Sequence, residues 1–199
     1  PNVWFAHMVH IDADEIRALA GSGSGIAHCP TSNMRLASGI APLQEYLRAG
    51  VDVSLGVDGS ASNDGSHMLA EGRQAMLLAR LKLAESGRSR DASLDVQVSA
   101  RQALELATVG GAAVLDRDDI GALRGGNCAD FFALKTDRLA YAGALHDPVA
   151  AAVLCAPQQA DLVVVNGHVV VQDGRISTVE MGPVIERHNN IAMAMVNSV

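Results

Sequence analysis

Three short apolar runs in the first third of the chain each lead to a polar side chain. Each run and the polar residue after it are, in chain order, residues 3–6 and His7, residues 25–27 and His28, and residues 51–55 and Asp58. The polar residues lie 21 and 30 positions apart, about one strand–helix unit each, and such units place their strands parallel. Because active sites of parallel α/β folds lie at the carboxyl ends of the strands, we expect the three side chains at one edge.

The segments between these runs carry helix signals. A helix is expected after Asp12, because Glu15 follows three residues later as in a capping box, and Gly21 is expected to end it. Two further helices are expected over residues 41–49 and 68–85, the second with one broad apolar face. The alternation of strands and helices predicts the α/β class.

Other connecting segments have weaker patterns. Residues 29–34, with the sequence Cys-Pro-Thr-Ser-Asn-Met, are expected to form a loop. A helix is expected to begin at Ser93 or Asp95, and a short one is expected from Thr108 through Leu115.

From Gly121 onward the pattern changes to short apolar strands joined by tight turns. Asn166-Gly167 is a strong signal for a two-residue hairpin, and Asp173-Gly174 marks a second turn. Strands are expected over residues 130–134, 161–165, 168–172 and 175–179, and a terminal helix over 184–196. We therefore divide the chain into residues 1–120, made of βα units, and residues 121–199, an antiparallel β element with a terminal helix.

Composition narrows the classes of function. A net charge of −7 and an aromatic content of 3% argue against nucleic acid as a partner. No apolar run approaches the roughly 20 residues of a membrane helix, so no membrane partner is expected. Cys29, Cys128 and Cys155 form no CxxC pair, and the first residues have no signal-peptide pattern. We expect a soluble cytoplasmic protein that acts on a small molecule.

The polar residues at the strand ends indicate which type of reaction the site could catalyse. His and Asp side chains are ligands of catalytic metal ions, so His7, His28 and Asp58 at one edge are typical of a metal-assisted hydrolase. Each residue also has a structural interpretation. Asp58 lies among small residues, as turn residues do; His7 is compatible with a buried histidine bonded to the backbone; and His28 is compatible with ordering the loop after it.

Three segments carry a resemblance to a known family. They are Phe5-Ala6-His7-Met8-Val9-His10, Ala27-His28-Cys29-Pro30-Thr31-Ser32-Asn33-Met34 and Gly56-Val57-Asp58-Gly59-Ser60-Ala61-Ser62-Asn63. They resemble the amidohydrolase superfamily, in particular its branch of guanine, cytosine and S-adenosylhomocysteine deaminases and triazine hydrolases. The hairpin over residues 165–174 is similar to the strand pair that follows the barrel there. The resemblance implies the carboxyl-terminal portion of a (β/α)8 TIM-like barrel, strands 6–8, followed by part of a small β-sandwich.

The resemblance also implies roles for individual residues. In that branch one divalent metal, zinc or alternatively iron, is held by a His-x-His pair, a His that begins a His-x-x-Glu motif, and an Asp on strand 8. Asp58 matches that Asp and is expected to be a metal ligand and catalytic base, and His7 matches the catalytic strand-6 His. His28 ends strand 7 and is expected to bind substrate. The sequence has neither a His-x-His pair nor a His-x-x-Glu at a strand end, so we expect a piece of a longer protein.

The implied activity is hydrolytic deamination of a small N-heterocycle by attack of metal-activated hydroxide. Residues 139–150 and the Ser62-Asn63-Asp64 stretch resemble members that act on oxidised purines, which implies conversion of 8-oxoguanine to urate and ammonia. Two alternatives stay open: a chlorotriazine or other N-heterocycle hydrolase of the same superfamily, and a non-catalytic fragment without the amino-terminal ligands. The resemblance also implies a homo-oligomer.

Overall fold

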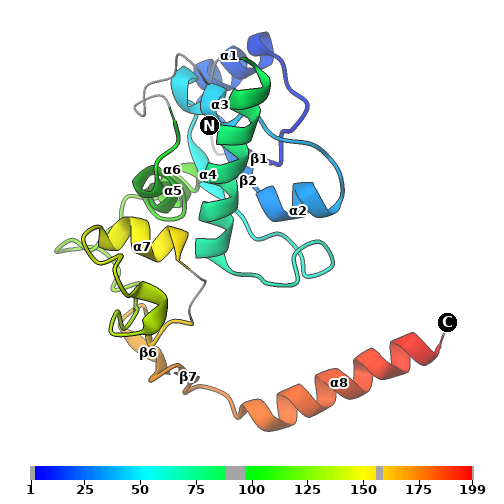
Figure 1. Cartoon of the computed structure of the whole chain (residues 1–199), viewed down its shortest axis with the longest axis vertical. Coiled ribbons are helices and arrows are strands. Elements are labelled where there is room, and N and C mark those ends of the chain that lie inside the picture. The colour runs from blue at the N-terminus through cyan, green and yellow to red at the C-terminus, as the bar shows by residue number, and fades with distance from the viewer. Residues whose placement is uncertain (1–2, 88–96, 156–158, 199) are drawn as a thin grey trace. The chain divides into compact units, whose positions relative to one another are not determined.

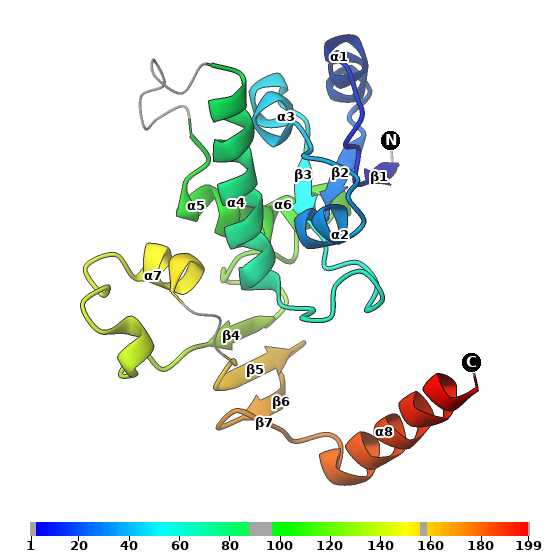
Figure 2. The ribbon, with the colours of Figure 1, turned by 45° about the vertical axis from the view of Figure 1, so that its right-hand side comes forward.

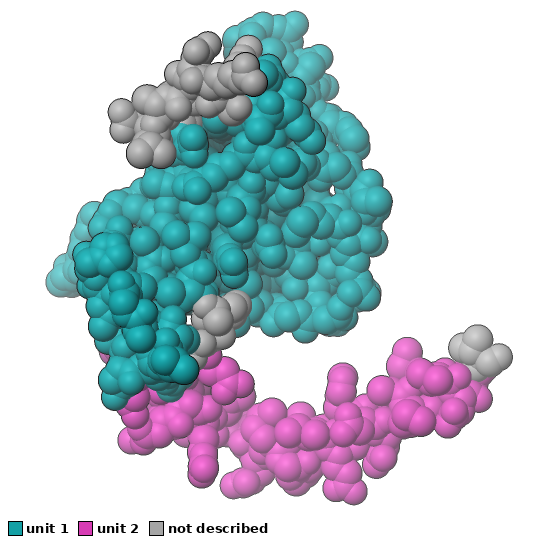
Figure 3. Space-filling model, in the orientation of Figure 1, with its two compact units in different colours: residues 1–127, 136–157 teal, residues 128–135, 158–199 magenta. Residues whose placement is uncertain are grey.

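The computed structural model describes residues 3–87, 97–155 and 159–198. The chain divides into two compact units, Pro1–Asn127 with Thr136–Pro157, and Cys128–Lys135 with Gln158–Val199 (Figure 3). The helix start expected at Ser93 or Asp95 lies outside the described residues. No helix in the described ranges is long and apolar enough to cross a membrane.

The first unit contains a parallel sheet of three short strands, in the order β1-β2-β3 (Figure 2). The strands are β1 (Trp4–Ala6), β2 (Gly25–His28) and β3 (Val53–Leu55). Phe5 pairs with Ile26, and Ile26 pairs with Val53, so the carboxyl ends of all three strands reach the same edge. The parallel strands and the α/β class predicted from the sequence are confirmed.

Helices connect and cover these strands (Figure 1). They are α1 (Ala13–Ser22), α2 (Pro30–Arg35), α3 (Leu43–Ala49), α4 (Met68–Glu85), α5 (Ala100–Leu106), α6 (Val109–Val114) and α7 (Pro148–Leu154), with a 3₁₀ turn, η3 (Leu139–Tyr141). The long helix α4 packs against α2, α3, α5 and α7, and α6 packs on β3. Ile26, Tyr46 and Met76 are fully buried at the centre of this core.

Local capping explains the helix boundaries. Asp12 accepts hydrogen bonds from the backbone of Asp14 and Glu15, and the Glu15 side chain accepts from the Asp12 backbone, so the predicted capping box is confirmed. The expected end at Gly21 is wrong, because the helix continues to Ser22. Gly23, not Gly21, adopts the left-handed conformation that ends the helix, with φ of 69°.

The loop expected over residues 29–34 is also wrong. Pro30 begins α2, where its ring presets the helical φ and its missing N–H group leaves no helical bond unmade. Ser32 and Asn33 face the interior of the unit and are almost completely buried. This short helix therefore brings two polar side chains under the edge where β1 and β3 end.

The second unit contains an antiparallel sheet in the order β4-β5-β6-β7. Its strands are β4 (Phe131–Ala133), β5 (Leu162–Val165), β6 (His168–Gln172) and β7 (Arg175–Ile176). Asn166 and Gly167 have φ of 47° and 78°, as a tight hairpin turn with two left-handed residues requires, so the predicted hairpin is confirmed. The helix α8 (Met181–Asn197) follows and has no buried residue.

Candidate metal and catalytic site

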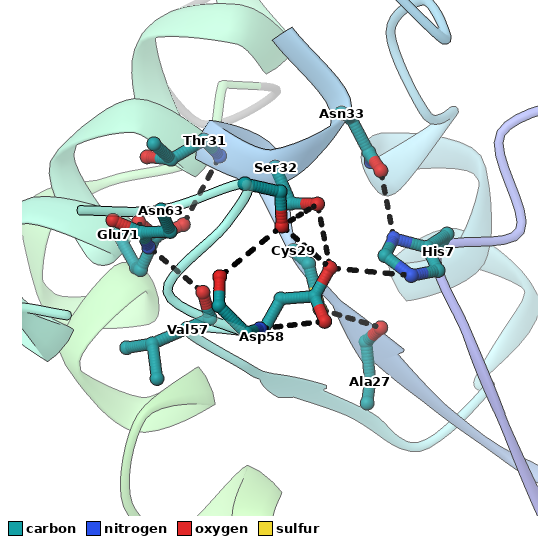
Figure 4. Close-up of polar contacts among 12 residues, drawn as sticks. His7, Ala27, Cys29, Thr31, Ser32, Asn33, Val57, Asp58, Asn63 and Glu71 are labelled. Carbon is teal, nitrogen blue, oxygen red and sulfur yellow. Dashed lines mark hydrogen bonds and ion pairs between the residues drawn. The ribbon is translucent and has the colours of Figure 1, made fainter. Parts of the chain in front are cut away.

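His7 and Asp58 come together at the carboxyl edge of the parallel sheet (Figure 4). His7 directly follows β1 and Asp58 lies three residues after β3, and His7 Nε2 is 3.6 Å from Asp58 Oδ2. Each side chain is about one third exposed. Both residues have left-handed backbones, with φ of 67° for His7 and 61° for Asp58. Such conformations are uncommon outside glycine and gather at functional sites, because the surrounding fold has to hold them.

The Asp58 carboxylate is oriented by three hydrogen-bond donors. Oδ2 accepts from Ser32 Oγ at 2.5 Å and from Ser62 Oγ at 3.2 Å, and Oδ1 accepts from the Gly59 backbone N–H at 2.8 Å. These bonds, that from Ser32 above all, together with the nearby His7, outweigh partial desolvation and lower the pKa of Asp58 below its ordinary value. Asp58 is thus an ionised, fixed carboxylate that is open to solvent.

His7 is held by the side chain of Asn33. His7 Nδ1 lies 2.8 Å from Asn33 Oδ1, while Nε2 faces Asp58. Asn33 and Ser32 are consecutive residues of α2, so one helix contacts both strand-end residues. Sequence reasoning missed these two contacts because they join positions 26 residues apart; the only signal was the presence of small polar residues directly after His28.

His28 lies on the same edge but beneath it. Its side chain is 2% exposed, and burial, with a smaller effect of His7, lowers its pKa to about 4. The ring is therefore neutral at neutral pH. Among the described residues nothing forms a hydrogen bond with its buried Nδ1 atom.

A buried glutamate on α4 joins the two segments that carry these residues. Glu71 is 1% exposed; its Oε2 accepts from the Thr31 backbone N–H at 3.1 Å, and its Oε1 accepts from Asn63 Nδ2 at 2.8 Å. Asn63 Nδ2 also donates to the Val57 carbonyl. Sequence reasoning did not single out Glu71, because nothing in a helical Glu reveals that it is buried.

Cys29 and His67 have structural roles. The Cys29 thiol is buried, and burial, with the charges of Asp58 and Glu71, raises its pKa to about 11, so it is not a nucleophile at neutral pH. His67 is the N-cap of α4, and its Nδ1 accepts from the Ala70 backbone N–H at 3.4 Å.

The residues described fit one ligand of a metal site but not a complete site. Asp58 is ionised, solvent-accessible and fixed by neighbouring donors, which are the properties of a metal-binding carboxylate. Within residues 3–87, 97–155 and 159–198, no group of three or more His, Cys, Asp or Glu side chains is arranged to hold a metal ion.

Known proteins are similar to this chain in sequence and in fold. The chain is 44% identical over 196 residues to 8-oxoguanine deaminase from Pseudomonas aeruginosa, covering 98% of this chain and 41% of that protein. An atrazine chlorohydrolase from Arthrobacter aurescens complexed with zinc superimposes with a TM-score of 0.85 at 35% identity, over 94% of this chain and 40% of that one. An adenosine deaminase from Xanthomonas campestris with bound zinc superimposes with a TM-score of 0.87 at 27% identity, over 98% and 43%.

The chain thus spans about two fifths of the length of the curated relatives it matches. The sequence pattern of the amidohydrolase family covers residues 1–177. With this match, the 44% identity to a curated relative and the fold in common with zinc-bound relatives, the chain belongs to the amidohydrolase family.

Proposed function

We propose that this chain belongs to a metal-dependent aminohydrolase that converts 8-oxoguanine to urate and ammonia. In this proposal residues 1–120 are strands 6–8 of a catalytic barrel with their helices, and residues 121–199 are part of a small β-sandwich. The observation that carries the proposal is the pair of His7 and the ionised Asp58 at the carboxyl edge of a parallel sheet. The 44% identity to an 8-oxoguanine deaminase supports this substrate over other N-heterocycles.

The reaction exchanges an amino group for oxygen. Water adds to the ring carbon that bears the amino group, the carbon–nitrogen bond breaks, and ammonia leaves while the carbon becomes a carbonyl. A divalent metal, zinc by analogy with the zinc-bound relatives, would supply water with its pKa lowered to about 7 when bound. Asp58 would be its ligand from this chain.

Asp58 carries out both proton transfers, and His7 orients the attacking water. The Asp58 carboxylate takes the proton of the attacking water and returns it to the leaving amine. His7 forms a hydrogen bond with the attacking water through Nε2. Ser32, Ser62 and the Gly59 backbone keep the carboxylate in place during both transfers.

His28 is proposed to bind substrate. Support comes from its buried Nδ1 atom, which has no partner among the described residues and leaves one polar group of the neutral ring for a heterocycle. A buried polar atom without a partner costs about 1–3 kcal/mol, and a substrate hydrogen bond would remove that cost.

The second candidate is hydrolysis of a triazine or a related N-heterocycle. It is favoured by the TM-score of 0.85 to an atrazine chlorohydrolase, whose reaction would need the same metal and carboxylate. The third is a fragment without catalysis. Finding a His-x-His pair and a His-x-x-Glu motif in the same open reading frame supports an enzyme. Finding neither motif contradicts the proposal of an enzyme.

The test is ammonia release from 8-oxoguanine, guanine and hydroxytriazines. The assay uses two proteins, the 199-residue chain and the product of the complete open reading frame that encodes it. We expect 8-oxoguanine to be preferred, and we expect Asp58→Asn to lower kcat at least about 100-fold, because the amide neither takes the proton nor binds metal well. Asp116→Asn is the matched control, since Asp116 also has a left-handed backbone, with φ of 53°, but is exposed and lies outside the site. Full activity of Asp58→Asn refutes the assignment.

A further inference from the structure

The imidazole of His7 is constrained on both of its nitrogen atoms. Nδ1 lies 2.8 Å from Asn33 Oδ1, which is hydrogen-bond distance, and Nε2 lies 3.6 Å from Asp58 Oδ2, which is not (Figure 4). Only one of the two contacts is therefore a hydrogen bond. That contact is the one to Asn33.

The chemistry of the amide determines which ring nitrogen carries the hydrogen. An amide oxygen only accepts, so His7 Nδ1 has to donate to Asn33 Oδ1. A neutral imidazole has one N–H group, and its other nitrogen is then an acceptor. Nε2 therefore presents a lone pair on the side where Asp58 lies.

Asn33 is itself firmly held. It is 2% exposed, and the helix α2 that carries it is fixed on both sides. Ser32 donates to Asp58, and the Thr31 backbone N–H donates to the buried Glu71. The Asn33 amide nitrogen is buried and has no partner among the described residues, so no other hydrogen bond of this amide competes with its contact to His7.

We propose that Asn33 is a positioning residue that holds His7 as the Nδ1–H tautomer, with Nε2 as the hydrogen-bond acceptor of the site. The tautomer follows from the placement of Asn33 Oδ1 toward the ring, and its use rests on the proposed function: Nε2 accepts a hydrogen bond from the attacking water, next to the carboxylate that takes the proton. Asn33 touches neither water nor substrate and acts through His7.

Nitrogen-15 NMR of the complete gene product with labelled histidines measures the tautomer directly. Spectra are recorded above pH 8, where an ordinary histidine ring is neutral, and His7 is assigned by the signal that a His7→Gln variant loses. We expect protonated Nδ1 and unprotonated Nε2 in the wild type.

Three variants test the role of the amide. Asn33→Leu should shift His7 toward Nε2–H, Asn33→Asp should keep Nδ1–H, and Asn127→Leu should leave the tautomer of His7 unchanged. Asn127 is the matched control because it loses one hydrogen bond, to the Ala122 carbonyl, outside the site.

Steady-state kinetics of the same variants test whether this tautomer of His7 supports catalysis. Asn33→Leu should lower kcat at least roughly 10-fold with KM within about 3-fold, and Asn33→Asp should recover much of the loss. A wild-type His7 with Nε2–H overturns the proposal by itself, even if a variant fails to fold, and so does an Asn33→Leu protein that keeps Nδ1–H. If the wild type has the Nδ1–H tautomer but releases no ammonia from any heterocycle, the proposed function fails while the assignment of Asn33 stands.

Discussion

At the scale of residues, the strand-end side chains differ because their surroundings differ. Asp58 has three hydrogen-bond donors and open solvent, so it stays charged, whereas His28 is buried and stays neutral. His7 contacts the neutral amide of Asn33. Environments that separate the protonation states of neighbouring groups are how a site assigns acid and base roles. Because His28 is neutral while Asp58 is charged, the protonation of His28 can be tested separately from that of Asp58.

The stability of the protein should depend on pH through His28. Its pKa is lowered from 6.5 to about 4, so the unfolded chain binds more protons than the folded one between these values. The free energy of unfolding should therefore fall as pH falls from about 6.5 to about 4, by up to about 3 kcal/mol from this residue. Urea unfolding of the wild type and His28→Gln across this range should show a shallower pH dependence in the variant. His188→Gln, at an exposed position on α8, should keep the wild-type dependence, and equal slopes in all three proteins would contradict the assignment.

At the scale of elements, α6 shows how closely a helix approaches the sheet. The helix α6 packs on β3, and a Cβ atom added at Gly110 would clash with the backbone oxygen of Val53. At the neighbouring Gly111 the same atom would meet nothing within 4 Å. Of these two residues of α6, packing requires a glycine at position 110 but not at position 111.

These two glycines give a matched pair of variants. Gly110→Ala should destabilise the first unit by about 1–3 kcal/mol, because α6 has to move away from β3. Gly111→Ala should be neutral or stabilising by up to about 1 kcal/mol, because alanine favours the helix and nothing opposes its side chain. Thermal and urea unfolding of both variants measure this difference. Equal effects would mean that α6 does not contact β3 this closely.

The same elements show what the sequence could predict. The strands, the helix over residues 68–85 and the Asn166-Gly167 hairpin carry periodic or turn signals that are local, and the structure confirms them. The helix α2 was missed because its residues have weak helix propensity and are fixed by distant partners. Ser32, Asn33 and Glu71 were missed for the same reason. Their contacts with Asp58, His7 and the Thr31 backbone join positions 26 to 40 residues apart, which no local pattern reveals.

At the scale of the whole molecule, the polar network belongs to the first unit. His7, Asp58, α2 and Glu71 all lie in it, and the second unit has its own antiparallel sheet. The strands β1 and β3 each pair with β2 and have no second strand partner among the described residues. Such open edges can pair with further strands.

Metal binding by the 199-residue chain tests how much of the site this sequence contains. Catalytic zinc sites use three protein ligands, and within the described ranges Asp58 is not joined by two further His, Cys, Asp or Glu side chains in a suitable arrangement. The purified chain should therefore hold well under one equivalent of zinc after dialysis, and Asp58→Asn should hold no less than the wild type, because a single carboxylate binds zinc weakly. The product of the complete open reading frame, treated in the same way, should retain about one equivalent if it contains the other ligands, and there Asp58→Asn should lower the content. Stoichiometric zinc in the 199-residue chain, measured by metal analysis, would show that its own residues complete the site.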